Sequence, residues 1–238
     1  MSSMHWGAEL PIGEKVDASR AKVPQRSTMR GRSTTLEALD PQKHGESLWE
    51  NLGGQQNASL WVYVFDGPYL ERGAFELELE RKARSQEYLF FAVVDNESDR
   101  AVGLAAYLNI HPAHRSIEVG SILYSRALQR TRGATEAMYL MARHAFEVLG
   151  YRRYEWKCNS LNEPSRRAAA RFGFTFEGIF RQHLIVKERN RDTAWFSLLD
   201  REWPSRKAAF ERWLEPTNFD GEGRQKFALT KLIAEGRQ

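Results

Sequence analysis

Residues 117–137 read IEVGSILYSRALQRTRGATEA and join a short apolar strand, a basic turn and the start of a helix. The strand part alternates, and we expect one face to hold Ile117, Val119, Ser121 and Leu123. The first amides of a helix lack intrahelical partners, and the helix dipole favours negative charge there. This order of parts therefore predicts a site for an anion, of which phosphate and pyrophosphate fit best.

The helix that closes this stretch is predicted over residues 135–149, where apolar residues recur with helical spacing and Gly150 forms a natural C-cap. Arg130 and Arg132 add full positive charges to the turn before it. Neither GxxxxGK[ST] nor GxGxxG occurs anywhere in the chain. We therefore reject a P-loop and a dinucleotide-binding fingerprint.

The turn at residues 129–134, QRTRGA, resembles the acetyl-coenzyme A (acetyl-CoA) pyrophosphate loop Q/R-x-x-G-x-G/A of the GNAT acetyltransferases. The TEA that follows resembles the start of this helix in the RimJ/RimL-like branch of that family. In this register Arg132 stands where the family has its first glycine, whereas a register beginning at Arg130 keeps Gly133 and ends on Thr135. We prefer the first register. The resemblance implies that the cofactor phosphates contact Gln129, Arg130, Thr131, Arg132, Gly133, Ala134 and Thr135.

A second signature lies at residues 154–178, YEWKCNSLNEPSRRAAARFGFTFEG, which read as strand, loop, helix and strand. Asn162 is a typical helix cap, and Gly173 ends the helix. The string resembles the RimJ/RimL-like segment N-x-x-S-x-x-x-x-x-x-x-G-F, in which the asparagine bonds the pantetheine arm and the serine lies near the thiol. By position these residues are Asn162 and Ser165. The alternative is that Asn162 only caps the helix and Ser165 only fills its first turn.

The two signatures together imply a GNAT fold of the α/β (α+β) class. Such a fold has a mixed, mostly antiparallel twisted sheet, helices on both faces and a splayed central strand pair. The splay would leave backbone amides free to hold pantetheine at Ile122, Leu123 and Tyr124.

The rest of the chain fits this order of elements. Strands are predicted at residues 33–39, 88–95, 101–110, 117–124, 154–159, 174–186 and 192–199, and residues 187–191 form the last turn. Further helices are predicted at residues 41–52, 71–85 and 202–214. We divide the chain into an N-terminal arm (1–32), an acetyltransferase domain (33–214) and a C-terminal extension (215–238). Apolar residues in the extension predict that it docks on its own domain or on a second subunit of a homodimer.

Acetyl transfer needs a base for the attacking amine and a proton or hydrogen bond for the departing thiolate. We expect Glu118 to be the base and Ser165 to be the acid or thiolate hydrogen-bond donor. Glu177 and Asp192 are alternative bases. Glu118 also has a structural alternative, as an edge-exposed strand carboxylate paired with Arg115.

Other reactive side chains carry weaker arguments. Isolated histidines are more often structural, so we do not assign His111, His114 or His183 to catalysis. Cys158 lies on an alternating strand, which favours burial over nucleophilic catalysis. No metal is expected, because the close pair His111 and His114 lacks a matching set of ligands.

Composition limits the class of protein. With 238 residues, of which 42% are apolar, the chain is expected to form one large domain with additional segments. A single cysteine excludes an internal disulfide framework, no apolar run reaches eighteen residues, and residues 1–13 do not read as a signal peptide. We expect a cytoplasmic protein that does not enter a membrane.

The net charge of +4 is unevenly distributed, since residues 143–191 hold 11 Lys and Arg but 5 Asp and Glu. In the GNAT interpretation this part surrounds the phosphates of acetyl-CoA. A basic face also suits nucleic acid, but no nucleic-acid-binding motif accompanies it, and we do not expect nucleic acid as the main ligand.

The expected activity is therefore transfer of an acetyl group from acetyl-CoA to a primary amine by direct attack in a ternary complex. The acceptor is a small molecule, an amino acid derivative or a peptide N-terminus, and the lack of a visible docking motif favours a small molecule. Residues 60–69, LWVYVFDGPY, line the acceptor groove or belong to the core. The alternative function is an acyl-CoA-binding protein with weak turnover, since Arg132 departs from the family's glycine.

Overall fold

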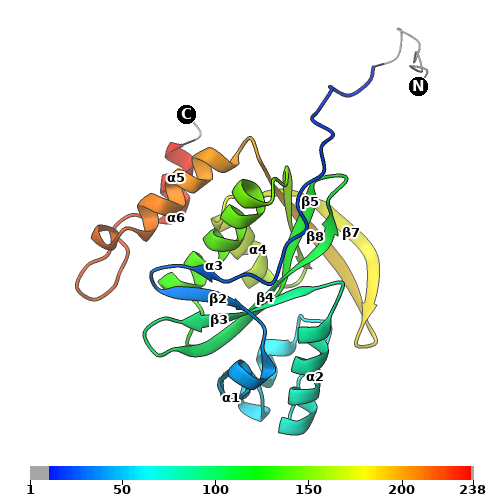
Figure 1. Cartoon of the computed structure of the whole chain (residues 1–238), viewed down its shortest axis with the longest axis vertical. Coiled ribbons are helices and arrows are strands. Elements are labelled where there is room, and N and C mark those ends of the chain that lie inside the picture. The colour runs from blue at the N-terminus through cyan, green and yellow to red at the C-terminus, as the bar shows by residue number, and fades with distance from the viewer. Residues whose placement is uncertain (1–10, 237–238) are drawn as a thin grey trace.

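The strand predicted at residues 117–124 is β5 (Ser116–Tyr124), near the middle of an eight-stranded sheet in the computed structural model, which describes residues 11–236 (Figure 1). The order across the sheet is β1-β2-β3-β4-β5-β6-β8-β7. The other strands are β1 (Met29–Arg30), β2 (Thr34–Ala38), β3 (Leu89–Asp95), β4 (Arg100–His111), β6 (Arg153–Asn159), β7 (Thr175–Val186) and β8 (Arg189–Leu199). The α-helices are α1 (Pro41–Leu52), α2 (Arg72–Arg84), α3 (Arg132–Arg143), α4 (Glu163–Arg171), α5 (Trp203–Leu214) and α6 (Leu229–Glu235). Short 3₁₀ helices are η1 (Gln55–Trp61) and η3 (Pro216–Asn218), and η2 (His144–Val148) is a π-helical turn that continues α3.

Every neighbouring pair of strands is antiparallel except β5 and β6, which run parallel. Their pairing covers four residues and stops at Val119 and Trp156. Beyond that point β5 continues beside β4 as far as Tyr124, while β6 continues beside β8 as far as Asn159. The mixed, mostly antiparallel sheet with a splayed central pair is therefore confirmed.

A bulge in β5 corrects the predicted alternation. Ser121 has a φ of 47°, and the register with β4 shifts there. Ile117 and Val119 consequently pack in one core, whereas Leu123 packs in the core on the opposite face. The simple period-2 pattern fails because the extra residue of a bulge inverts the direction of the side chains that follow it.

Helices cover both faces of the sheet, as expected, and each face has its own apolar core. α1, α2 and η1 close one face over Leu48, Trp61 and Phe75. On the other face, α3 to α6 cover a larger core (Figure 1). Burial on two faces explains why the central strands β3 and β4 read as nearly continuous apolar runs.

The last hairpin differs from its prediction. β8 begins at Arg189, and the turn consists of Lys187 and Glu188, both with positive φ. Two consecutive residues in this conformation form the tight turn that matches the twist of paired strands. Arg191, which we expected in the turn, therefore lies within a strand.

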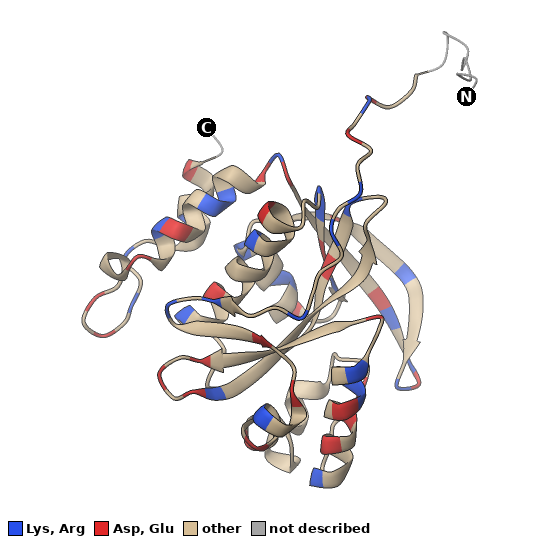
Figure 2. Cartoon of the chain, viewed as in Figure 1, with Lys and Arg blue, Asp and Glu red and all other residues tan. Residues whose placement is uncertain are grey.

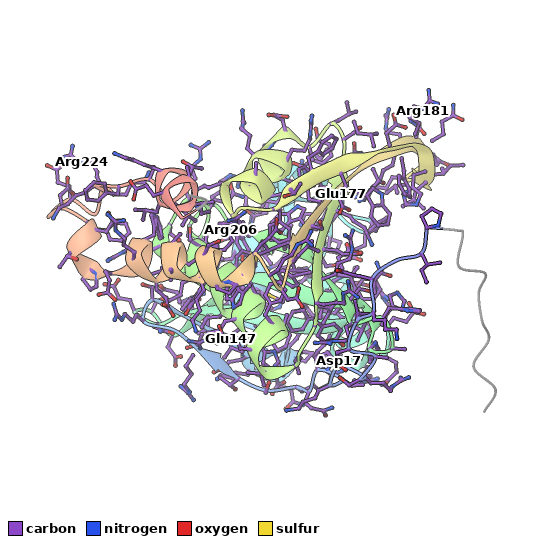
Figure 3. All side chains as sticks on the ribbon, turned by 90° about the horizontal axis from the view of Figure 1, so that it is seen from above. Asp17, Glu147, Glu177, Arg181, Arg206 and Arg224 are labelled. Carbon is purple, nitrogen blue, oxygen red and sulfur yellow. The ribbon has the colours of Figure 1, made fainter. Side chains whose placement is uncertain are left out.

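The two ends of the chain pack on the domain. In the extension, Leu229, Leu232 and Ile233 are buried in the same core as α3 and α5, so this segment docks on its own domain. Figure 3 shows Arg224 at the outer end of the loop between α5 and α6. The predicted arm supplies β1, and the Ala21 amide donates to the Pro112 carbonyl at 3.0 Å. Residues 1–10 of the arm and 237–238 of the extension lie outside the described residues.

Candidate active site

The gap between β5 and β6 opens into a cleft of about 2050 Å³. Its walls come from β5, the start of α3, α4, β8 and the segment after η1, and part of the C-terminal extension reaches one end. All but one of the predicted site residues line it; Gly133 is the exception, and it lies against Leu128, Thr131 and Thr34.

One wall of the cleft is the free edge of β5. Ile122, Leu123 and Tyr124 lie beyond the last pair with β6, so the backbone groups that face the gap have no strand partner there. An extended ligand with amide groups can add to such an edge in the manner of a further strand.

The start of α3 forms one end of the cleft. The helix begins at Arg132, three residues before the predicted start, because the Thr131 hydroxyl oxygen accepts from the Ala134 amide at 3.1 Å and caps it. The predicted turn over residues 129–134 is thus partly helical. Thr131, Arg132 and Ala134 at this start line the cleft end, where the helix dipole favours an anion.

Arginines surround this helix start. Arg132 lies over the Phe219 ring at 4.7 Å, which ties the start of α3 to the extension. Arg171 of α4 donates to the Thr135 hydroxyl at 3.0 Å and lies over the Trp213 ring at 5.0 Å. Desolvation lowers the pKa of Arg171, and no described carboxylate lies within 4 Å of it. A guanidinium in that position is suited to a phosphate.

The α4 wall brings Asn162 and Ser165 to the cleft, beside Trp156 and Cys158 of β6. The Ser165 hydroxyl oxygen accepts a hydrogen bond from Trp156 Nε1 at 3.0 Å. The hydroxyl hydrogen of Ser165 therefore points away from Trp156. Asn162 Oδ1 caps α4 by accepting from the Ser165 amide at 3.2 Å. The capping interpretation of Asn162 therefore holds, and its Nδ2 donates to no described residue. Burial raises the pKa of the Cys158 thiol, which disfavours the thiolate.

Glu118 is buried at the point where β5 and β6 part. Asn109 Nδ2 donates to its Oε2 at 2.6 Å, and Lys157 Nζ pairs with the same oxygen at 2.8 Å. No described residue donates to Oε1, so this atom can accept a proton from a ligand. Burial raises the pKa of Glu118, while Lys157 and Asn109 oppose that rise.

The structure also bears on the structural alternative for Glu118 and on the two alternative bases. Its predicted pairing with Arg115 is wrong, because Arg115 bonds the Gly150 carbonyl and Asp17, and Glu118 is not exposed at an edge. Glu177 and Asp192 do not line the cleft. Arg153 holds the pKa of Glu177 below its ordinary value, and Figure 3 shows Glu177 on the long β7 ribbon. Hydrogen bonds from Asn190 and Gln182 lower the pKa of Asp192.

Residues 60–69 divide between the core and the cleft, and their contact with the acceptor stays a prediction. Trp61 is buried in the core, while Tyr63 and Phe65 are exposed and line the cleft. Of the three histidines that the sequence analysis considered for catalysis, His111 and His183 line the cleft and His114 does not. In the view of Figure 2, Lys and Arg are interspersed with Asp and Glu and do not gather on one face.

A family model described as an acetyltransferase (GNAT) domain matches residues 49–175, more than half of the chain. The chain belongs to the GNAT acetyltransferase family. A GCN5-related N-acetyltransferase from Brucella melitensis is 46% identical, with a TM-score of 0.90 over 92% of this chain and 99% of that one. A GNAT-family structure from Chromobacterium violaceum is 41% identical, with a TM-score of 0.74 over 82% of this chain and 98% of that one. The Bacillus subtilis protein named "Putative ribosomal N-acetyltransferase YdaF" is 30% identical over 187 residues, which are 78% of this chain and 98% of that protein.

Membership of this GNAT family makes the chain an acyl-CoA-dependent N-acetyltransferase, with acetyl-CoA as the acetyl donor and an amine as the acceptor. Within residues 11–236, no group of three or more His, Cys, Asp or Glu side chains is placed to hold a metal ion. In the same residues, no helix is long and apolar enough to cross a membrane.

Sequence reasoning missed several residues of the cleft. Lys157 and Asn109 both bind the carboxylate of Glu118. The backbone of Asn109 has a positive φ of 46°, which no local pattern predicts. Arg171 is the last residue of α4. Its i, i+4 spacing from Arg167, which also lines the cleft, places the two arginines on one face of the helix.

Proposed function

We propose that this GNAT enzyme acetylates a small primary amine by direct attack in a ternary complex, with Glu118 as base and Ser165 as hydrogen-bond donor to the departing thiolate. The observation that carries the proposal is that Glu118 of β5 and Ser165 of α4 line one cleft at the point where β5 and β6 separate. Their two elements contribute one proton acceptor and one proton donor.

The cleft supports one orientation of acetyl-CoA. The pyrophosphate suits the first amides of α3 with Arg132 and Arg171, because both the helix start and the guanidinium groups favour phosphate. Pantetheine suits the free edge of β5 at residues 120–124, and Asn162 Nδ2 offers a further donor. This orientation brings the thioester to the splay.

The chemical step follows from these positions. The neutral amine nitrogen attacks the thioester carbonyl carbon, a carbon–nitrogen bond forms, and the carbon–sulfur bond breaks. Glu118 takes the proton that the amine loses, through Oε1, which no described side chain occupies. The sulfur leaves as a thiolate, and the Ser165 hydroxyl hydrogen bonds to it, since Trp156 already fixes the hydroxyl oxygen.

The shape of the acceptor side supports a small amine. Lys187 of the β7–β8 turn donates to the Trp61 carbonyl at 2.8 Å, which joins the hairpin to η1 across that side of the cleft. Aromatic side chains, including Phe65 and Trp195, line the cleft. An amine on a small molecule fits behind this link more readily than one on a folded protein surface.

The proposal is tested by two measurements on the full chain. Acetyl-CoA should raise the melting temperature in a thermal-shift assay, and a panel of small amines should release free coenzyme A thiol. Binding of acetyl-CoA without thiol release over the whole panel would contradict the proposed transfer. Faster release with folded ribosomal proteins than with any small amine would contradict the choice of acceptor.

Two further expectations stay predictions: a cytoplasmic location and a homodimer. The division into arm, domain and extension stays a proposal as well.

A further inference from the structure

The wall of the cleft formed by β8 contains a buried cation without an acidic partner. Arg191 is 6% exposed and lines the cleft together with Thr193 and Trp195, the next two residues on the same face of the strand. Its guanidinium lies over the Phe65 ring at 4.5 Å, and its Nε donates to the Thr193 hydroxyl at 3.4 Å. Among residues 11–236 no carboxylate lies within 4 Å of Arg191.

Two lysines show how the same fold pairs other cations: Lys82 is buried, and 12% of the Lys157 side chain is exposed. Lys82 pairs with Asp66 at 2.5 Å and with Glu78 at 2.6 Å. Lys157 pairs with Glu118 and Glu155, both at 2.8 Å. A buried charge is costly unless it is paired, so each lysine has two carboxylates. Arg191 has no carboxylate partner to offset the cost of burying its charge, and its contacts are one hydroxyl and one aromatic ring.

Trp195 supplies a second, independent observation on this wall. Its indole Nε1 is buried and has no hydrogen-bond partner among the described residues. The ring is held in place by Lys157, whose Nζ lies 4.0 Å from its centroid, and by Phe180 at 4.5 Å. Buried donors without acceptors are rare in folded proteins and need an explanation, and on a cleft wall a bound ligand can complete the bonding. Both unpaired groups of this wall are donors, so the complementary ligand carries acceptor oxygens and, at Arg191, a negative charge.

The position of this wall assigns the charge to the acceptor. Arg191 contacts Phe65, in the segment after η1, whereas the arginines suited to the phosphates of acetyl-CoA lie around the start of α3. Desolvation lowers the pKa of Arg191, while the charge of Glu118 raises it. The guanidinium therefore interacts electrostatically with the proposed base. An arginine remains charged at any physiological pH.

We propose that the acceptor amine carries a carboxylate on the same molecule and that Arg191 binds this carboxylate while Glu118 receives the amine proton. The inference rests on the proposed function and adds the class of substrate: an α-amino acid or a similar aminocarboxylate. An acidic first residue of a peptide offers the same chemistry. Trp195 Nε1 adds a hydrogen bond to another oxygen of the acceptor.

The test compares matched acceptors by free-thiol release with acetyl-CoA. One arm uses free α-amino acids and their carboxamides, and a second uses short peptides beginning with Asp or Glu and the same peptides beginning with Asn or Gln. We expect kcat/KM for the best carboxylate acceptor to exceed that for its amide by about 100-fold, as for a site built to bond a charged group. The arm that shows this ratio identifies the source of the carboxylate.

Variants assign the preference to Arg191. Arg191→Gln should lower kcat/KM for the carboxylate acceptor by about 100-fold, mainly through KM, and change that for the amide by less than about threefold. Arg189→Gln, which removes the same charge from an exposed position two residues away on β8, should change neither.

Three outcomes would overturn the inference. Equal wild-type activity on acids and amides would do so without any variant, even if Arg191→Gln fails to fold. Equal losses on both acceptors in Arg191→Gln would show a structural role for the arginine. Absence of thiol release with every amine would overturn the proposed function itself. This outcome differs from the first two, in which the enzyme still releases thiol.

Discussion

The donor side and the acceptor side of the cleft are built in different ways. The donor side consists mainly of two local stretches, the turn before α3 and the helix α4, together with the free edge of β5. The acceptor side joins β4, β5, β6, β8 and the segment after η1, so that Asn109, Glu118, Lys157 and Arg191 meet from four strands. A phosphate is recognised by local backbone geometry, whereas an acceptor is recognised by side chains that only the sheet brings together. Substitutions that affect the cofactor phosphates should change cofactor binding, whereas substitutions of the groups that act on the reacting atoms should change turnover.

Glu118→Gln is the substitution with the largest expected effect on the acceptor side. Removing the general base should lower kcat by about 10³-fold. The dissociation constant for acetyl-CoA, measured by calorimetry, should stay within about threefold, because Glu118 lies away from the proposed phosphate site. Glu177→Gln is the matched control outside the cleft and should keep wild-type turnover. Normal activity of Glu118→Gln at every pH would remove Glu118 from the mechanism.

Ser165→Ala should lower kcat by about 10²-fold with little change in acetyl-CoA binding, since the hydroxyl acts on the thiolate as it forms. The Trp156 indole would lose its acceptor, which should reduce the free energy of unfolding by about 1 kcal/mol. Steady-state kinetics and chemical denaturation measure the two effects separately. A larger loss in cofactor affinity than in kcat would show that Ser165 binds the cofactor and does not act on the thiolate.

Arg171→Gln addresses the donor side. It should weaken acetyl-CoA binding by about 30-fold, the effect of losing one charge-assisted hydrogen bond, and leave turnover at saturating cofactor nearly unchanged. Arg166→Gln changes the same charge on α4 at a position that does not line the cleft, and should have little effect. Equal affinities for the two variants would contradict the phosphate role of Arg171.

The acid limb of the pH profile reports Glu118. Because burial raises its pKa, kcat/KM should fall as the pH drops through a value above the ordinary 4.5, and Glu118→Gln should lack this limb. A raised folded-state pKa means that the fold favours the protonated carboxyl. Its contribution to stability is therefore greatest below the unfolded pKa and declines as the pH rises through the folded one. The stability of Glu118→Gln relative to wild type should increase over that window, and denaturation at several pH values would show a decrease if the sign is wrong.

Arg132→Ala should have the smallest effect, a loss of about threefold to fivefold in acetyl-CoA affinity. Its side chain is exposed and shared with the Phe219 ring, and exposed charges contribute little. Isothermal titration at low and high salt checks this, because the loss should shrink as salt screens the charge. An unchanged dissociation constant at low salt would refute any phosphate role for Arg132.

The sequence predicted most of the fold because its elements are locally encoded. Pro41 begins α1 and Gly150 follows the α3 region as expected, since caps and helix-breaking residues act within a few positions. The start of α3 was misplaced because the apolar period begins after its first turn, which Thr131 caps. The faces of β5 were misassigned after Ser121 because a bulge leaves no mark on the alternating pattern.

The donor residues could be predicted from two motifs, whereas the acceptor residues other than Glu118 could not. Arg191 was expected in a turn, and only the register of β8 with β7 places it on the cleft wall. Lys157 reads as one polar residue of an alternating strand, and its pairing with Glu118 depends on the β5–β6 register. Contacts between strands distant in sequence carry no local signal in a single chain.

The most direct test of the account is a crystal structure of the enzyme with coenzyme A. We predict that the pyrophosphate lies at the first amides of α3 within hydrogen-bond distance of Arg171, that pantetheine follows residues 120–124 of β5, and that the sulfur lies between Ser165 and Glu118. A sulfur atom remote from both side chains, or a pyrophosphate away from α3, would contradict it.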